Sequence, residues 1–419
     1  MKVFKFGGAS VKNAEGVRNM ASIVKSFPGD LIIVISAMGK TTNALEEIAK
    51  NYFAGKKEEL KSGIENLKNY HLSIVNELFV EDEPSPGKRI ADEFEALAKR
   101  LLNTLPSLDF DFEYDQIVSM GEILSSIIAS AYLNKAGIFN RWIDVRQCLR
   151  TDDTWREGNI DWALSCKLVP LDFNFSDSKV YLTQGFIAAT SFNSTTTLGR
   201  EGSDYTAAII ANILDAECVT IWKDVPGIMN ADPNKFETTQ KLDELSYREA
   251  VEMTYYGAKV IHPKTMKPLV EKNIPLFVKS FFHPSESGSV IYNIDHPMEY
   301  VPVFINKEDQ VLITISPLDF SFMAEESIGK IYNLFSKYRM KVNLVQQSAM
   351  DFSVAIDKPE RNLDQLILDL KNNFAVHYNE GLELLTIRYY DEETIHKMVK
   401  ERVVFVEQRT RRTARFLLK

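Results

Sequence analysis

The first 36 residues limit the fold more than any other part of the sequence. Residues 2–6 (KVFKF) mix apolar residues with lysines as a strand does, and Gly7 and Gly8 then turn the chain. Helical spacing follows at 14–26, and residues 31–36 (LIIVIS) form a continuous apolar run, typical of a strand buried on both faces. Because strand, helix and strand in this order make a βαβ unit, we predict an α/β fold with a largely parallel open sheet between helices.

The α/β alternation, with one helical interruption at 56–104, continues to about residue 290. We therefore predict one α/β domain at 1–298. The remaining segment, 299–419, has another rhythm. It opens with two predicted strands, VPVFINKED and QVLITIS. The second begins a β-α-β-β-α-β order over 311–380, which is a ferredoxin-like plan. The last strand of that order, FAVHYN, is followed by a partial repeat that starts with the strand LELLTIRYY and runs to the C-terminus. Two adjacent modules of this kind indicate paired binding domains.

The charge and cysteine patterns argue against several classes of function. The formal net charge is −9, whereas nucleic-acid and membrane-surface binding both need a basic footprint. Cys148, Cys166 and Cys218 form no CxxC pair and the histidines are scattered, so we predict no disulfide framework and no metal held by the protein. The N-terminus does not read as a signal peptide, and the apolar runs are far shorter than a membrane span. We expect a cytoplasmic protein without nucleic-acid or membrane partners.

Lys5 and the glycine turn after it form the first candidate site. Gly7 and Gly8 allow backbone N–H groups to approach an anion, and the helix that follows adds partial positive charge at its N-terminus. Lys5 can then neutralise charge on a transferred phosphoryl group. A plain β-turn remains an alternative, because the KxGG pattern by itself is weak.

The second candidate site is the segment GREGSD at 199–204, which directly precedes a helical run. Arg200 has the planar donor geometry that binds a carboxylate with two hydrogen bonds. Asp204 is suited to organising a centre that contains phosphates and cations. The alternative is that Ser203 or Asp204 only caps the helix.

Three weaker candidates complete the set. Glu122, in SMGE, follows a predicted glycine turn and either binds an ammonium group or only complements the helix dipole. Lys223 and Asp224 open a polar loop after a buried strand, which is where open parallel sheets place ligands, although an ordinary exposed loop reads the same way. Lys259 follows a helix-ending glycine and either serves that helix end or reaches a phosphate.

Taken together and in this order, these segments resemble the aspartate kinase branch of the amino acid kinase family. The matching segments are KFGGAS, VISAMGKTTN, VSMGE, TQGFIA, TTTLGREGSDYTAA, WKDVPGIMNADP and GAKVIHP. The tail resembles the paired ACT modules of the same family, in which one module is inserted into the other. The resemblance therefore places a first ACT module at 311–380 and a shortened second module at 301–309 plus 381–419.

The resemblance implies an enzyme that uses ATP, with Mg²⁺ carried by the nucleotide, to phosphorylate the side-chain carboxylate of L-aspartate. This is the first step toward lysine, threonine and methionine, and feedback by an end-product amino acid is implied. A homo-oligomer, dimeric or larger, formed through the ACT region is expected. No dinucleotide-binding pattern follows the tail, so we expect the form that is not fused to a homoserine dehydrogenase.

The resemblance also implies roles for single residues. Lys5 stabilises the phosphoryl group in flight and Asp204 orients the charged centre. The residues implied to bind aspartate are Ser36, Thr42, Glu122 and Arg200. The residues implied to contact the nucleotide are Lys5, Gly7, Gly8, Lys223, Asp224, Met229, Asn234 and Lys259.

Several of these positions depart from the usual family pattern. Ala9 and Lys223 replace threonines, and Met229 and Asn234 stand where relatives often carry tyrosine and arginine. We hypothesise that Lys223 or Lys235 compensates at the nucleotide.

The effector region departs further. The positions implied to line an effector site are Phe322, Met323, Val342 and Asn343. Asn343 stands where lysine-sensitive relatives carry an aspartate, and an amide binds an ammonium group less strongly than a carboxylate does. Lysine, threonine and the absence of any effector therefore remain open alternatives.

Two other functions compete with the leading interpretation. One is another amino acid kinase, acting on glutamate, acetylglutamate or a nucleotide, which the SMGE and GREGSD segments and the ACT-like tail disfavour. The other is a catalytically silent amino-acid sensor that keeps the fold. The complete charged set of Lys5, Glu122, Arg200 and Asp204 disfavours that reading.

Overall fold

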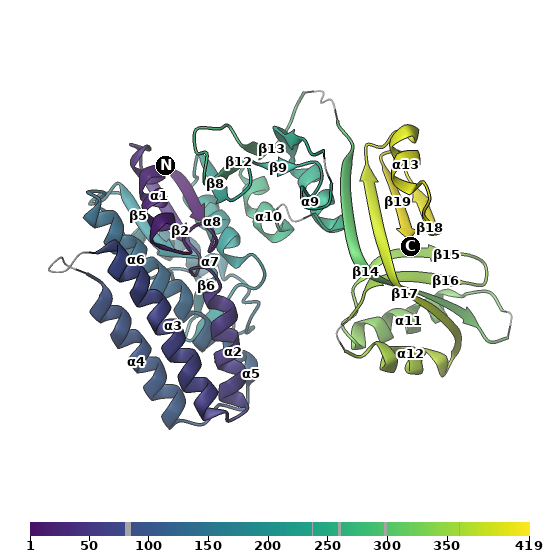
Figure 1. The fold of residues 1–419 in the computed structure, drawn as a ribbon, viewed down its shortest axis with the longest axis horizontal. Coiled ribbons are helices and arrows are strands. Elements are labelled where there is room, and N and C mark those ends of the chain that lie inside the picture. Colours follow the sequence, from purple (N-terminus) through teal and green to yellow (C-terminus); the bar gives the residue numbers. More distant parts are fainter. Residues whose placement is uncertain (80–84, 237, 259–260, 297–299, 320, 360) are drawn as a thin grey trace. The chain divides into compact units, whose positions relative to one another are not determined.

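The computed structural model describes residues 1–79, 85–236, 238–258, 261–296, 300–319, 321–359 and 361–419 (Figure 1). The chain divides into two compact units. The first comprises Met1–Ile228, Lys241–Val251 and Val260–Asp295, and the second comprises Met229–Gln240, Glu252–Lys259 and His296–Lys419. The predicted boundary between residues 298 and 299 lies outside the described residues. Two short segments that precede it group with the second unit, so the predicted domain limits remain a prediction.

The first unit is built on an eight-stranded sheet with the order β11-β13-β12-β8-β1-β2-β5-β3. Every described pair in it is parallel except β12 with β13. The prediction of a largely parallel sheet is therefore confirmed. Its strands are β1 (Lys2–Phe6), β2 (Leu31–Ile35), β3 (Arg141–Ile143), β5 (Val180–Gln184), β8 (Cys218–Lys223), β11 (Glu244–Ser246), β12 (Leu276–Ser280) and β13 (Ser289–Tyr292).

Two smaller sheets and several helices complete the chain before residue 296. The small strands are β4 (Arg150–Thr151), β6 (Ile187–Thr190) and β7 (Thr195–Thr197) in one sheet, and β9 (Ile228–Met229) with β10 (Lys241–Leu242) in the other. The helices are α1 (Ala14–Lys25), α2 (Thr41–Phe53), α3 (Lys57–Leu78), α4 (Gly87–Asn103), α5 (Phe110–Val118), α6 (Met120–Lys135), α7 (Trp162–Asp172), α8 (Gly202–Ile213), α9 (Tyr247–Tyr256) and α10 (Pro263–Glu271), with a 3₁₀ turn at Val145–Gln147.

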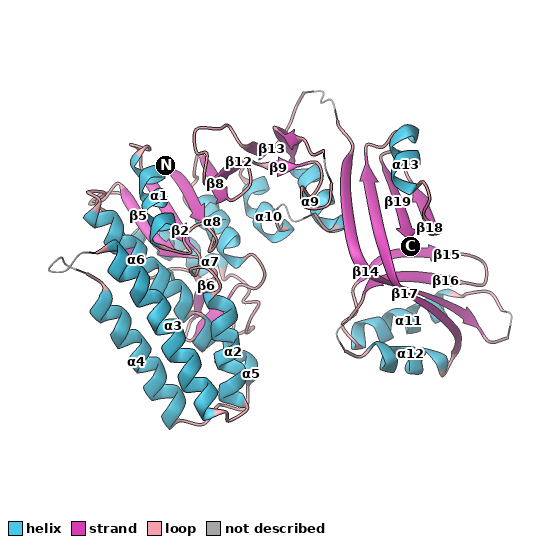
Figure 2. Ribbon diagram, in the orientation of Figure 1, coloured by secondary structure: helices cyan, strands magenta, loops and turns pink. Residues whose placement is uncertain are grey.

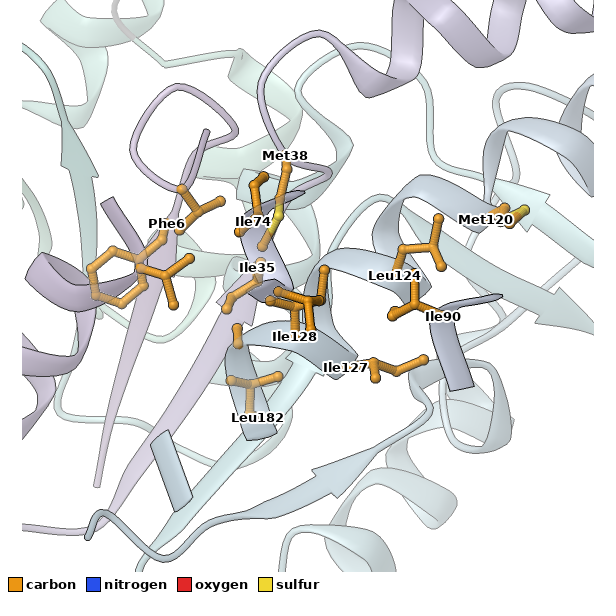
Figure 3. Close-up of a cluster of buried hydrophobic side chains, with 14 of the residues drawn as sticks. Phe6, Ile35, Met38, Ile74, Ile90, Met120, Leu124, Ile127, Ile128 and Leu182 are labelled. Carbon is orange, nitrogen blue, oxygen red and sulfur yellow. The ribbon is translucent and has the colours of Figure 1, made fainter. Parts of the chain in front are cut away.

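The predicted helical interruption is present as α3 and α4, which run beside α6 (Figure 2). Figure 3 shows why they belong to the main core: Ile74 of α3 and Ile90 of α4 join the cluster that contains Ile35 of β2 and Ile128 of α6. All five residues of β2 are buried, as its unbroken apolar run predicts. The interruption therefore extends the core of the sheet.

One helical stretch of the described residues, Phe110–Lys135, is long and apolar enough to cross a membrane by length and composition. However, 78% of its most apolar window is buried inside the fold. A core helix of a folded domain has the same character.

The second unit contains a six-stranded antiparallel sheet with the order β15-β16-β14-β17-β19-β18. The strands are β14 (Val303–Pro317), β15 (Val342–Gln347), β16 (Phe352–Asp357), β17 (Phe374–Arg388), β18 (Val404–Arg409) and β19 (Thr413–Leu418), and the helices are α11 (Glu325–Lys337), α12 (Leu363–Lys371) and α13 (Glu392–Val399). Strands β14 to β17 have the ferredoxin-like order. The start of β14 completes a second set with β17, β18 and β19.

The strand boundaries in this sheet differ from the prediction. The segments VPVFINKED and QVLITIS were expected as two strands, but they form the single strand β14, and two more predicted strands merge into β17. The register between β14 and β17 shifts between Lys307 and Leu312. Asp309 in this stretch has a left-handed backbone (φ 51°), and the irregularities allow β14 to change partner and still continue as one strand.

Candidate active site

Lys5 and Asp204 meet inside the first unit. Lys5 lies on β1, in register with Val34 of β2 and Ile221 of β8, so it has a strand on either side. Asp204 lies in the first turn of α8. The Nζ atom of Lys5 is 2.6 Å from Oδ1 of Asp204, and both residues are buried. The contact is a buried ion pair.

Glu122 lies in the first turn of α6, within electrostatic reach of Lys5. Only 3% of the residue is exposed. Burial raises the pKa of Glu122 to about 8, and the Lys5 charge and a hydrogen bond from the backbone of Ala37 oppose that rise. Its Oε2 atom is buried and has no hydrogen-bond partner within the described part of the chain. The site therefore contains a carboxyl oxygen that is available to a ligand with N–H or O–H donors.

The turns that follow β1 and β2 are joined to each other. The N–H of Ser36 donates to the carbonyl of Phe6 (3.1 Å), and the N–H of Gly39 donates to the carbonyl of Gly8 (2.9 Å). A Cβ atom at Gly8 would lie 2.4 Å from the carbonyl oxygen of Ala37, so only glycine permits this approach. The two loops thus form one surface at the carboxyl ends of adjacent parallel strands, where α/β sheets bind ligands.

The structure corrects the prediction for SMGE. Gly121 is not a turn: it is the second residue of α6, and Ser119 joins this helix to α5. A Cβ atom at Gly121 would lie 2.9 Å from Cγ2 of Thr41 and 3.1 Å from Cβ of Ala37. The glycine is needed because α6 packs directly against the loop after β2, and this close packing brings Glu122 to that loop.

The capping alternative for Ser203 and Asp204 is wrong. The cap of α8 is Glu201, which adopts a left-handed conformation with φ of 54°, and both other residues lie inside the helix. The Oε2 atom of Glu201 accepts a hydrogen bond from the N–H of His262 at 2.7 Å. Arg200 lies in the turn just before this cap and is exposed.

The remaining residues predicted to bind aspartate lie on the loop after β2. Ser36 follows β2 directly and Thr42 lies in the first turn of α2, and both are half-buried. The structure thus gathers Lys5, Asp204 and Glu122 in the interior, and it leaves Arg200 at the surface.

The predicted nucleotide residues divide between the two units. Gly7 and Gly8 leave β1, and Lys223 ends β8, the neighbouring parallel strand, with the exposed Asp224 next to it. The Oγ atom of Ser10 donates to the carbonyl of Trp222 at 3.5 Å, which ties the glycine turn to the end of β8.

Other nucleotide predictions fall outside this group. Met229 and Asn234 lie in the second unit, and Lys259 lies outside the described residues. Lys235, the alternative compensating cation, pairs with Glu308 at 2.7 Å within the second unit.

The predicted effector residues differ in their exposure and contacts. Phe322 is 75% exposed, whereas Met323 is buried in the core of the second unit. Val342 begins β15, and the amide of Asn343 is used inside the sheet. Its Oδ1 accepts from Lys307 (2.8 Å), and its Nδ2 donates to Oε1 of Gln310 (2.9 Å) and to Oδ1 of Asp357 (2.8 Å).

One buried carboxylate was not singled out from the sequence. Asp115 on α5 is fully buried, and burial raises its pKa to about 6 although hydrogen bonds from Arg156 and Thr197 oppose the rise. In the sequence, the one sign of this buried carboxylate is that Asp115 stands close to the apolar residues of EYDQIV. No group of three or more His, Cys, Asp or Glu side chains that could hold a metal ion occurs among the described residues.

Known proteins match this chain over almost its whole length. A model of the amino acid kinase family matches residues 1–280. Lysine-sensitive aspartokinase 3 of Escherichia coli is 31% identical over 395 residues, which span 92% of this chain and 86% of that protein. The crystal structure of E. coli aspartokinase III in complex with aspartate and ADP has a TM-score of 0.82 at 27% identity and covers 100% of this chain and 96% of the other. The structure of the same protein in complex with lysine and aspartate also has a TM-score of 0.82 at 27% identity, covering 100% and 95%. The chain therefore belongs to the amino acid kinase family and, within it, to the aspartokinases.

Proposed function

We propose that this chain transfers the γ-phosphoryl group of ATP to the side-chain carboxylate of L-aspartate, forming 4-phospho-L-aspartate and ADP. The observation that carries the proposal is the buried Lys5–Asp204 ion pair beside the unpartnered oxygen of Glu122. The Lys5 ammonium group can balance the charge of an anionic phosphoryl group, and the Glu122 oxygen can accept a hydrogen bond from an amino-acid ammonium group. The similarity to a structure that holds aspartate and ADP supports this reading.

In the proposed reaction, a carboxylate oxygen of aspartate attacks the γ-phosphorus while the bond to the β,γ-bridging oxygen breaks and ADP leaves. The attacking carboxylate is already ionised, so the step needs no general base. It needs the two reactants held in line and their negative charge balanced. Lys5 supplies the positive charge at the centre, and Asp204 holds the Lys5 ammonium group in position.

The proposed aspartate site combines a buried contact with a surface contact. Glu122 receives the α-ammonium group, and Arg200 binds the α-carboxylate with its planar pair of donors. Ser36 and Thr42 add hydroxyl groups from the loop after β2.

We propose that the backbone N–H groups of Gly7 and Gly8 contact the nucleotide phosphates, with Lys223 and Asp224 at the end of the neighbouring strand. Met229, Asn234 and Lys259 remain proposed nucleotide contacts. Asp204, the carboxylate proposed at the reaction centre, is already paired with Lys5. One paired carboxylate suits Mg²⁺ that arrives bound to ATP better than a site built wholly from protein ligands.

We further propose that the product leads to lysine, threonine and methionine, and that an end product acts on the ACT-like sheet of a cytoplasmic homo-oligomer. The lysine-bound structure of E. coli aspartokinase III motivates lysine as one effector, and threonine is the second candidate. Phe322, Met323, Val342 and Asn343 stay the proposed effector positions. Because Lys307 already occupies the amide oxygen of Asn343, a ligand ammonium group would have to compete for it.

The direct test is to trap the product. Purified protein is incubated with ATP, Mg²⁺ and L-aspartate, and hydroxylamine converts the acyl phosphate to a hydroxamate. Parallel reactions contain glutamate, N-acetylglutamate or a nucleoside monophosphate, and aspartate reactions are titrated with lysine and threonine. We expect hydroxamate from aspartate. Product only from another acceptor would identify a different amino acid kinase, and no product from any acceptor would favour the silent sensor.

A further inference from the structure

Asp115 is a buried carboxylate for which the proposed mechanism has no use. Its Oδ2 atom accepts hydrogen bonds from the backbone N–H groups of Arg156 (2.9 Å) and Thr197 (3.0 Å), and its Oδ1 accepts one from Oγ1 of Thr197 (2.7 Å). A carboxylate accepts all three at once, whereas no apolar side chain accepts any. The carboxylate of Asp115 is costly to bury, and its hydrogen bonds join three segments: α5, the loop at Arg156 and β7.

Two of these segments support the turn that carries Arg200. The N–H of Gly158 donates to the carbonyl of Thr197 at 2.9 Å, so the loop after Arg156 runs along β7. A Cβ atom at Gly199 would lie 3.2 Å from the carbonyl oxygen of Arg156, which means that this loop packs against the residue just before Arg200. Arg156 itself has φ of 68°, a conformation unfavourable for a non-glycine residue, and its N–H bond to Asp115 stabilises it.

The third segment is the helix that leads to Glu122. Asp115 lies on α5, and Ser119 continues the chain into α6 with helical backbone angles (φ −55°, ψ −26°). Gln116 adds a second tie from the same helix. Its Nε2 donates to the carbonyl of Thr195 (2.7 Å), and its Oε1 accepts from the N–H of Thr195 (3.2 Å). The side chains of Asp115 and Gln116 therefore hold α5 against β7, and α5 directly precedes the helix that carries Glu122.

We propose that Asp115 is a positioning residue for the amino-acid substrate: it fixes the β7–Arg200 segment against the helix that carries Glu122. The inference rests on the proposed function, in which these two groups bind the two ends of the aspartate backbone. Asp115 then sets the spacing between them without touching the substrate. Its removal must weaken aspartate binding selectively and leave the nucleotide side, on β1 and β8, intact.

Two pairs of variants test this. Thr197→Val removes one hydroxyl group from the cluster, and Thr197→Ser keeps it. Asp115→Ala removes all three bonds, and Glu113→Ala is its matched control. Glu113 is a buried carboxylate on the same helix, but it pairs with Arg100 and accepts from the N–H of Ser107 (3.1 Å), away from β7.

The readouts are the KM for aspartate, the KM for ATP and the thermal midpoint. We expect Asp115→Ala to raise the KM for aspartate about tenfold or more and Thr197→Val about threefold, with the KM for ATP within about twofold of wild type. Thr197→Ser should behave as wild type. Glu113→Ala should lower the thermal midpoint and leave the KM for aspartate unchanged.

Three results would overturn the inference: an unchanged KM for aspartate in Asp115→Ala, an equal rise in both KM values, or the same selective rise in Glu113→Ala. If Asp115→Ala does not fold, the Thr197 pair decides by itself, because each of its members keeps the carboxylate. Failure of the proposed function is a separate result, since wild-type protein would then give no aspartyl hydroxamate at all.

Discussion

The two units contain buried polar clusters that differ in how far their members satisfy one another. In the first unit, Lys5 and Asp204 pair, but one oxygen of Glu122 has no partner. In the second unit, the amide of Asn343 makes hydrogen bonds with three neighbouring side chains, and both of its polar atoms are used. A buried polar atom without a partner is costly, which makes the Glu122 oxygen a candidate to receive a hydrogen-bond donor from a ligand. Our proposal gives the first cluster a binding role, whereas the contacts of the second cluster join strands.

The largest test of this contrast is Lys5→Ala. We expect kcat to fall about 10³-fold, because the positive charge that offsets the phosphoryl oxygens is lost in a buried site. Hydroxamate formation measures this effect. The control is Lys2→Ala on the same strand, whose ammonium group lies over the ring of Phe27 and away from Asp204. If turnover survives Lys5→Ala, Lys5 is not needed for phosphoryl transfer, and the proposed catalytic role of the first cluster is wrong.

Glu122→Gln tests the unpartnered carboxyl group. Because the pKa is raised to about 8, this group is mostly protonated below pH 8 and ionised above it. Only the ionised form attracts the α-ammonium group, so the wild-type KM for aspartate should fall as the pH rises toward and through 8. The substitution should raise that KM about tenfold to a hundredfold and remove this pH dependence. Steady-state kinetics over a pH series measure both effects, with Glu113→Gln as the control for loss of a buried carboxylate. A wild-type KM that does not change with pH would contradict the role.

Asn343→Ala tests the satisfied cluster. Removing the amide leaves buried polar groups of Gln310 and Lys307 without this partner, so we expect a loss of stability of about 1–3 kcal/mol. Calorimetry should show a lower thermal midpoint, while kcat and both KM values without effector stay unchanged. Asn372, an exposed asparagine at the end of α12, provides the matched Asn→Ala control. A fall in kcat without a change in the thermal midpoint would give Asn343 a role that the contacts do not predict.

The sequence predicts those parts of the fold and of the candidate site that depend on neighbouring residues. Local patterns are sufficient for β1, β2 and the first helix, because strand and helix periodicity and a glycine turn are properties of neighbouring residues. They also pointed to Lys5 and Asp204, whose ion pair the structure shows.

Features that depend on distant contacts were not predictable. Gly121 reads as a turn, but a glycine is needed there because Thr41 and Ala37 lie against α6. In the same way, Asp115 is one acidic residue among several until β7 is packed beside it. The merger of predicted strands into β14 depends on its pairing with β17, which no local pattern in KEDQ reports.

The smallest expected effect concerns the two lysines that are candidates to compensate at the nucleotide. Lys223 ends the strand next to the Gly7–Gly8 turn in the first unit, whereas Lys235 is paired with Glu308 in the second. We expect Lys223→Ala to raise the KM for ATP about threefold to tenfold and to leave the KM for aspartate unchanged, because a partly exposed cation adds modest attraction for phosphate. Lys235→Ala, measured in the same assay, should change neither. Equal rises in both KM values for Lys223→Ala would refute its place at the nucleotide. An effect of Lys235→Ala on the KM for ATP alone would assign the compensating role at the nucleotide to Lys235, and its pairing with Glu308 would then have to give way to the phosphates.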